Sequence, residues 1–117
     1  MKIDLTYLRD MSAGNKALVI EMIEIFKRQV VEFVEQMSAL NDKQDYENLG
    51  KLAHKAKSSI SIMGLNDLAK DLKTFENIAK AGVETEKYPI FIGRFRDETS
   101  DAVAELDEVL NNIDIYI

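Results

Sequence analysis

The sequence predicts an all-α protein, an antiparallel four-helix bundle with a short additional helix at the N-terminal end. Apolar residues recur at three- and four-residue steps through most of the chain, which is the periodicity of amphipathic helices. No segment alternates apolar and polar residues as a half-buried strand does. Four long amphipathic segments with short connections pack most simply as a bundle of antiparallel neighbours.

The composition is that of one globular domain, expected over residues 1–117, with 46% hydrophobic and 31% charged residues. The chain has no cysteine, which excludes disulfides, thiol catalysis and thiolate metal sites. Its net charge of -6 argues against nucleic acid as the main partner, because phosphate binding needs a dominant basic face. We find neither the apolar core of a signal peptide nor an uncharged run approaching the ~20 residues of a membrane span, so we expect a cytoplasmic protein.

The first predicted helix is short and covers residues 4–11. Asn15 is the expected N-cap of a long second helix over residues 16–40, since asparagine readily accepts a hydrogen bond from the first turn. The expected apolar face of this second helix comprises Leu18, Met22, Ile25, Val30, Phe33, Met37 and Leu40, widened by Val19, Ile23, Phe26 and Val34.

The third predicted helix runs from Tyr46 to about Met63, with Asp45 as its N-cap. Gly64 is expected to stop it, because glycine accepts a left-handed backbone with little strain. A fourth helix follows at once and ends at Gly82. The residues expected to face inward are Leu49, Leu52, Ala53, Ala56, Ile60 and Met63 on the third helix, and Leu65, Leu68, Leu72, Phe75 and Ile78 on the fourth.

The last predicted helix follows a linker over residues 83–87. Pro89 suits its first turn, where the missing N–H does no harm. We expect this helix to continue without a break and to pack along its whole length through Ile92, Phe95, Thr99, Ala102, Leu106, Val109 and Ile113.

His54, the only histidine in the chain, points outward from the third predicted helix. At 100° per residue it lies roughly 160° from the centre of the buried stripe. Gly50 and Ser58, one turn before and after it, are small and are expected to leave the imidazole open to a bulky partner.

Lysines surround this histidine on the helical wheel. Lys51 and Lys57 flank the ring, and Lys55 lies further round. Their ammonium groups would favour the neutral, nucleophilic imidazole by like-charge repulsion and would also stabilise a phosphoryl dianion attached to it. The alternative is an ordinary solvated helix face, which is the commoner explanation of an exposed histidine.

The residues around the histidine form a motif: His54-x-x-Lys57-Ser58-Ser59, followed by Gly64, Leu68 and Leu72. This motif resembles the signature of histidine-containing phosphotransfer (HPt) domains, whose fold is a four-helix bundle of about this size. The chain departs from the family at Ser58, where glycine is frequent, and at Ala56, where leucine is common.

The resemblance implies a role in a phosphorelay. His54 would accept a phosphoryl group through Nε2 from an aspartyl phosphate on a response-regulator receiver domain and pass it to another receiver, while Lys57 would contact the phosphoryl oxygens. The receiver would bring Mg²⁺, so we expect no cofactor and no metal on this chain. A hybrid sensor histidine kinase is a further candidate partner, and we expect a monomer.

The resemblance also places a partner surface around the histidine. Glu76 and Lys80 correspond to family positions that border it, although Glu76 is acidic where the family often has a neutral polar residue. The expected partner-contacting residues are Gly50, Lys51, Lys55, Ser58, Ser61, Glu76 and Lys80. Members of the family dock their receivers on an apolar patch beside the histidine. Here the patch would be supplied by Tyr7, Leu8 and Met11, with Met22 or Ile23 behind them. Core packing is the alternative for each of these residues.

A helical adaptor and an enzyme are the alternatives to a phosphoryl carrier. A helical adaptor would use the same face without phosphoryl transfer, and an enzyme with His54 as general base would need a concave pocket. Kinase activity is excluded, because Lys55 stands where histidine kinases have an acidic residue and no ATP-binding segment is found. The acidic residues Asp42, Asp45 and Glu47 are better explained by helix capping than by a cation site.

Overall fold

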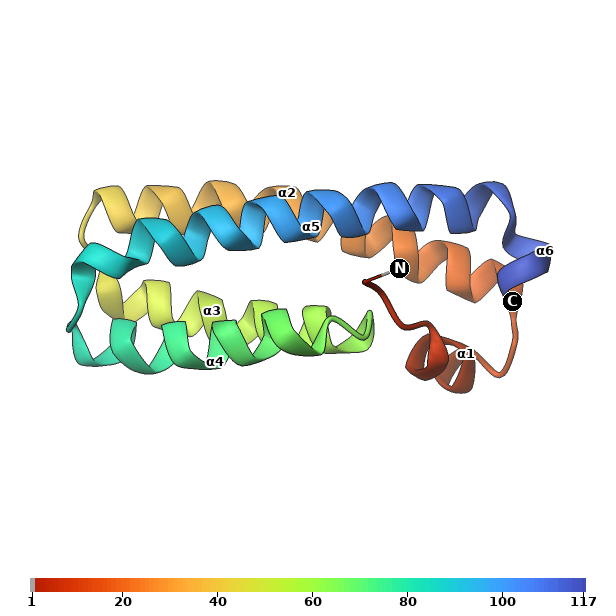
Figure 1. Cartoon of the computed structure of the whole chain (residues 1–117), viewed down its shortest axis with the longest axis horizontal. Helices are drawn as coiled ribbons and strands as arrows, with labels where there is room; N and C mark the ends of the chain where they lie inside the picture. The colour runs from red at the N-terminus through yellow and green to blue at the C-terminus, as the bar shows by residue number, and fades with distance from the viewer. Residues whose placement is uncertain (1) are drawn as a thin grey trace.

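The computed structural model describes residues 2–117, which form helices joined by short turns (Figure 1). The elements are α1 (Thr6–Ser12), α2 (Lys16–Asp42), α3 (Tyr46–Ile62), α4 (Asn66–Ala81), the 3-10 turn η1 (Thr85–Lys87), α5 (Tyr88–Asn111) and α6 (Ile113–Tyr116). No strand occurs within residues 2–117, and the all-α prediction is confirmed. None of the helices in this range combines the length and apolar character that a membrane span requires.

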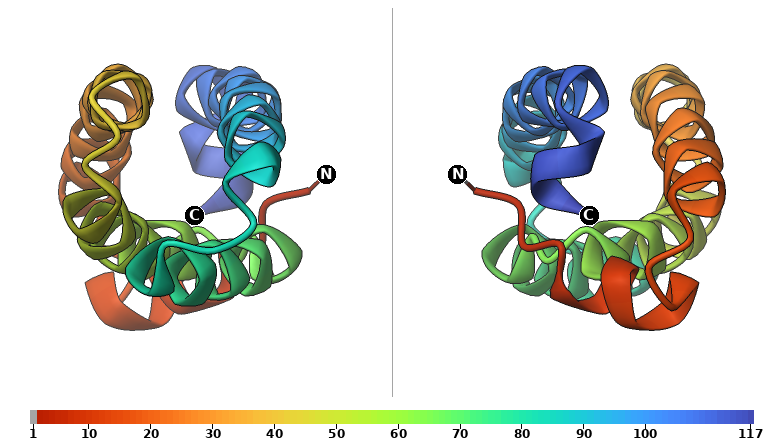
Figure 2. Two further views of the ribbon diagram at one scale, coloured as in Figure 1. Left: turned by 90° about the vertical axis from the view of Figure 1, so that its left-hand side faces the viewer. Right: turned by 90° about the vertical axis from the view of Figure 1, so that its right-hand side faces the viewer.

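The helices α2 to α5 form a four-helix bundle, and the chain as a whole measures 46 × 20 × 20 Å. Helices that are consecutive in the chain lie side by side, and α5 closes the bundle against α2 (Figure 2). With 27 and 24 residues, α2 and α5 are longer than α3 and α4, which have 17 and 16. They extend past the turn between α3 and α4, and α1 lies beside this turn, below the overhang (Figure 1).

The predicted helix boundaries follow from the expected capping groups. The side chain of Asn15 accepts a hydrogen bond from the Leu18 backbone N–H at 3.1 Å, and Asp45 caps α3 in the same way. At the far end of α3, Gly64 adopts a left-handed φ of 73°, as the sequence predicts. Gly82 ends α4 in the same conformation.

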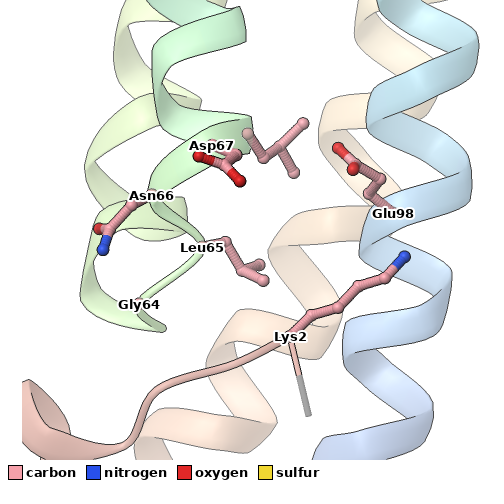
Figure 3. A pocket seen from close by; sticks show the side chains of 7 residues that line it. Lys2, Gly64, Leu65, Asn66, Asp67 and Glu98 are labelled. Atoms are coloured by element: carbon pink, nitrogen blue, oxygen red, sulfur yellow. The ribbon is translucent and has the colours of Figure 1, made fainter.

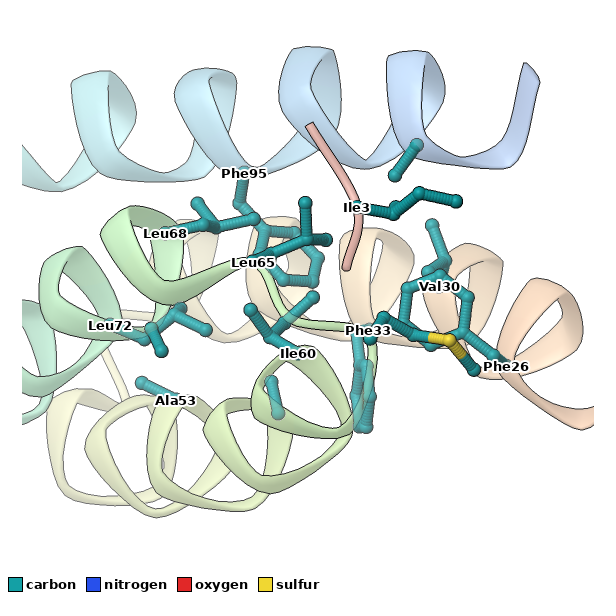
Figure 4. Packing of buried hydrophobic residues seen from close by; sticks show 14 of the residues in the cluster. Ile3, Phe26, Val30, Phe33, Ala53, Ile60, Leu65, Leu68, Leu72 and Phe95 are labelled. Carbon is teal, nitrogen blue, oxygen red and sulfur yellow. The ribbon is translucent and has the colours of Figure 1, made fainter. Parts of the chain in front are cut away.

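All four long helices contribute to one hydrophobic core (Figure 4). Every residue predicted for the inner stripe of α3 is buried, including Ala53, Ala56 and Ile60. Phe33 of α2 meets Phe95 of α5 edge-to-face with ring centroids 6.4 Å apart, a favourable aromatic contact between the two longest helices.

The buried face of α2 differs from the predicted stripe in the N-terminal half of the helix, whereas Val30, Phe33 and Met37 are buried as predicted. Leu18 and Ile25 are each 38% exposed, whereas Val19, Ile23 and Phe26 are buried. Helix α2 contacts α1 and α5 as well as α3, so its core face is set by three neighbours together. The sequence predicts both sets of residues as parts of one wide apolar face, and packing against the neighbouring helices buries only Val19, Ile23 and Phe26.

The predicted continuous last helix is interrupted. Asn112 has φ −131° and ψ 40°, so α5 ends at Asn111 and the short α6 follows. The Asn112 side chain donates to the backbone carbonyl of Glu108 at 3.1 Å, which satisfies one of the free carbonyls at the helix end. Ile113 is therefore only partly buried, at the start of α6.

Gly50 allows α3 and α4 to approach closely. A Cβ at this position would lie 2.7 Å from Cγ of Lys80, 3.1 Å from the Lys80 backbone nitrogen and 3.2 Å from the Glu76 carbonyl oxygen. A flexible side chain would move aside, but two of these atoms belong to the backbone of α4. A larger residue would therefore displace the helix.

We predict that Gly50→Ala lowers the free energy of unfolding by about 1 kcal/mol, because overpacking outweighs the better helix propensity of alanine. The matched control is Gly93→Ala in α5, where a Cβ would meet only the Arg96 side chain, at an ordinary 3.6 Å. That variant should be more stable than the wild type by up to about 1 kcal/mol. Urea denaturation measures both, and a shift in the same direction for the two variants would contradict the packing role of Gly50.

Candidate functional site

The site is centred on His54, on the outer surface of α3. Its side chain is 63% exposed, and Nδ1 lies 3.1 Å from both carboxylate oxygens of Glu76 on α4. The helical-wheel prediction of an outward histidine is therefore confirmed. What the wheel could not show is that the Nδ1 edge of the ring is hydrogen-bonded to a neighbouring helix.

The Glu76 carboxylate is buried behind the histidine. Its side chain is only 4% exposed, and it accepts a hydrogen bond from Lys80 Nζ at 2.7 Å. Lys73 Nζ lies 3.7 Å away on the other side. Because Lys73, Glu76 and Lys80 are three and four residues apart on α4, the helix itself places them on one face.

Glu76 is ionised at neutral pH. The hydrogen bond from Lys80 is the main cause that lowers the pKa of Glu76 from 4.5 to about 2, against the opposing effect of burial. The hydrogen bond and charge of His54 and the charge of Lys73 lower it further. The group behind the imidazole is thus a carboxylate anion.

The charge of Glu76 decides which ring nitrogen of the neutral imidazole carries the proton. A carboxylate only accepts hydrogen bonds, so the Nδ1 that contacts it must carry the proton. In the neutral ring, the lone pair is then on Nε2. This nitrogen makes no hydrogen bond within residues 2–117 and belongs to a mostly exposed side chain.

The lysines of α3 lie around the ring without contacting Glu76. Lys51 pairs with Glu47 at 3.6 Å, and Lys55 is exposed. Lys57 is partly buried and makes no ion pair within the described residues 2–117. Its position one turn after His54 puts its stem on the same face of the helix.

Two residues predicted to contact a partner lie behind the surface instead. Gly50 is buried against α4, so its small size serves the helix contact rather than the approach of a partner. Glu76 is also buried, because its carboxylate points back to His54 and Lys80. Ser58 and Ser61 are exposed, as their predicted place at the partner surface requires.

Lys73 was absent from the residues predicted for the site. The signal for it was its spacing on α4, three residues before Glu76 and seven before Lys80. The spacing alone does not place Lys73 at the site, because charged residues at such spacing are common on solvated helices. It is the burial of Glu76 against His54 that makes Lys73 part of the site.

An apolar surface adjoins the histidine face. One groove, of ≈ 340 Å³, is lined by Tyr7, Ser58, Ser61 and Ile62, and a second, of ≈ 200 Å³, shares Ile62 and includes Met22 and Ile25. We call these six residues the Tyr7 surface. Of the apolar residues considered from sequence, Tyr7 and Met11 are about half exposed, whereas Leu8 and Ile23 belong to the core.

A separate hollow lies at the turn between α3 and α4 (Figure 3). Its volume is ≈ 370 Å³, and Lys2, Asp67 and Glu98 bring charged side chains to its lining. The carboxylates outnumber the ammonium groups there, and His54 is about 15 Å away along the axis of α3. The hollow therefore does not extend the histidine site.

Comparison with known proteins identifies the family. A family model described as Hpt domain matches residues 21–108, more than half of the chain. The chain belongs to the Hpt domain family. No curated protein and no solved structure gave a match.

Membership of the Hpt family confirms the resemblance seen around His54 and the helical bundle that carries it. Hpt domains are histidine phosphotransfer intermediates of two-component phosphorelays and are not kinases. They interact with response-regulator receivers and kinases. The matched range includes all of α3 and α4, and therefore both His54 and Glu76.

Glu76 should give the fold a specific dependence on acidic pH. Its folded-state pKa is depressed, so it contributes stability that is present above pH 4.5 and is lost as the pH falls through about 2. We predict that the wild type loses more unfolding free energy than Glu76→Gln between pH 5 and pH 2, measured by urea denaturation. Parallel pH profiles for the two proteins would show that the carboxylate contributes nothing as an ion.

Proposed function

We propose that this Hpt domain carries a phosphoryl group between receiver domains on Nε2 of His54. The observation that carries the proposal is the contact of Nδ1 with the ionised Glu76, which leaves the lone pair on the exposed nitrogen. An outward nitrogen nucleophile suits transfer between two proteins, because donor and acceptor must each reach it in turn.

The transfer step needs no proton to be moved by this chain. The lone pair of Nε2 attacks phosphorus, the bond from phosphorus to the aspartyl oxygen breaks, and the receiver carboxylate leaves as an anion. Nδ1 keeps its proton, and the positive charge that develops on the ring faces the Glu76 carboxylate. Mg²⁺ and most of the transition-state stabilisation would come from the receiver.

Lysines supply the positive charge around the incoming phosphoryl group. We assign the main contact to Lys57, because it lies one turn from His54 and has no ion pair within residues 2–117. Lys80 already binds Glu76 at 2.7 Å, so it would have to share its ammonium group with the phosphoryl oxygens. Lys51 and Lys55 contribute charge at the rim.

The Tyr7 surface is the proposed docking site for the receiver. It is mostly apolar, it includes Ser58 and Ser61 of the histidine face, and it combines α1, α2 and α3. Ser59 donates to Gln29 Oε1 at 2.9 Å, which ties α3 to α2 underneath. A cytoplasmic location, where such receivers would be met, stays a prediction from sequence.

The direct test is phosphoryl transfer from a phosphorylated receiver. We expect the wild-type chain, mixed with receivers of its source organism and Mg²⁺, to gain acid-labile phosphate, and His54→Gln to gain none. The side chain is mostly exposed, so this variant should lose at most about 1 kcal/mol of unfolding free energy. Circular dichroism and urea denaturation control for folding.

Two outcomes would contradict the proposal. The first is a wild-type chain that no receiver labels, and the second is a His54→Gln chain that is labelled as strongly as the wild type. Receiver binding without any label would favour a helical adaptor instead.

Docking on the Tyr7 surface is tested with two substitutions on the same helix. Ile25→Asp should weaken the affinity of a receiver by about tenfold or more, because a carboxylate would be buried in an apolar contact. The control is Val31→Asp, on the groove between α2 and α5, where the side chain is 58% exposed. Calorimetric titration measures both, and equal losses for the two variants would show that the receiver docks elsewhere.

A further inference from the structure

The group behind His54 carries a full negative charge, although a neutral group would serve to orient the ring. A glutamine at position 76 could accept the same hydrogen bond from Nδ1 through its amide oxygen. The observed carboxylate is 3.1 Å from Nδ1 through both of its oxygens and is almost fully buried. Orientation of the imidazole therefore does not by itself account for the charge at this position.

The charge matters most when the ring is phosphorylated. A phosphoryl group on Nε2 uses the lone pair of that nitrogen, so a ring that keeps its proton on Nδ1 is a phosphoimidazolium cation. This cation would be in direct contact with the Glu76 carboxylate, as a charge-assisted hydrogen bond. Loss of the Nδ1 proton would leave the carboxylate facing a neutral nitrogen lone pair, which is unfavourable in a buried position.

We propose that Glu76 keeps the phosphohistidine protonated and thereby makes this domain a labile carrier that readily discharges its phosphoryl group. The inference rests on the proposed function, since it concerns the fate of the phosphoryl group on His54. It goes beyond that function because it states that position 76 sets the lifetime of the phosphorylated domain.

Protonation controls discharge through the leaving group. In transfer to a receiver, the aspartate oxygen bonds to phosphorus, the bond between nitrogen and phosphorus breaks, and its electron pair returns to Nε2. A ring that carries the Nδ1 proton leaves as neutral imidazole. A ring without it would have to leave as an imidazolate anion, which is a far poorer leaving group. Hydrolysis follows the same course, with water in place of the aspartate.

Other charged groups around the ring are cationic. Lys51, Lys55 and Lys57 lie around it on α3, while Lys73 and Lys80 lie on α4. The α4 lysines contact Glu76 itself, and Lys51 pairs with Glu47. The phosphoryl dianion would balance the cations nearest the ring, whereas Glu76 is the group in hydrogen-bond contact with Nδ1. Its effect on the Nδ1 proton should therefore dominate.

The experiment compares phosphohistidine lifetimes in the full chain. Potassium phosphoramidate phosphorylates histidine without a receiver, and ³¹P NMR then follows the loss of the signal between pH 5 and pH 10. We expect the wild type to stay labile to a pH about one unit higher than Glu76→Gln. In the pH range between the two transitions, the variant should keep its phosphoryl group about tenfold longer.

The matched control is Glu47→Gln, which removes one negative charge from α3 at a site that contacts Lys51 and not the ring. It should show the wild-type profile. Coincident profiles for the wild type and Glu76→Gln would overturn the inference. So would a shift of equal size in Glu47→Gln, because net charge alone would then explain the result.

A second measurement uses the wild type alone, so it tests the inference even if Glu76→Gln does not fold. ¹⁵N NMR of the phosphorylated wild type reports whether Nδ1 is protonated, with the same chain in urea as reference. We expect the folded chain to hold the proton to a pH about one unit higher, and equal transitions would overturn the inference. Because phosphoramidate phosphorylates histidine without a receiver, the two proposals can fail separately. If receivers do not label the chain, the proposed function is wrong, but the state of the phosphohistidine can still be measured. If the Nδ1 transitions are equal, the inference is wrong, but transfer from a receiver is unaffected.

Discussion

The contact of His54 with the buried carboxylate of Glu76 is the interaction on which the arrangement of the histidine site depends. It exists because Gly50 lets α4 lie close to α3, and because Lys80 and Lys73 stabilise a negative charge that burial would otherwise disfavour. The imidazole is thereby fixed in one tautomer while most of it stays in solvent. A surface residue thus acquires the defined chemistry of an active-site residue without a pocket.

The lengths of the helices explain how the Tyr7 surface is built. Because α2 and α5 extend past α3 and α4, the bundle has an overhang, and α1 covers part of it (Figure 1). Leu8 anchors α1 in the core, which turns Tyr7 outward beside Ser61 and Ile62. The short helix therefore contributes both to the core and to an exposed apolar surface at the side of the histidine.

In the proposed transfer, the two proteins contribute different groups. In the proposed function, this chain would offer a nucleophile, a counter-charge and a docking surface, all on helices, whereas the receiver would bring Mg²⁺ and most of the transition-state stabilisation. Such a division would suit an intermediate that reacts with a donor and an acceptor in turn, because both would approach the same outward side chain. Position 76 is where the chain itself would influence how long the phosphoryl group stays.

The sequence by itself determined the helices, their caps at Asn15 and Asp45, the stops at Gly64 and Gly82, and the outward position of His54. These features depend on residues within one or two helical turns, and their physics is local. The tertiary structure alone decided that Val19 and Ile23 are buried rather than Leu18 and Ile25, and that Gly50 and Glu76 lie between two helices. Those outcomes depend on how α4 and α5 are rotated against their neighbours, and a rotation between helices is fixed by the packing of both surfaces together, which neither segment encodes alone.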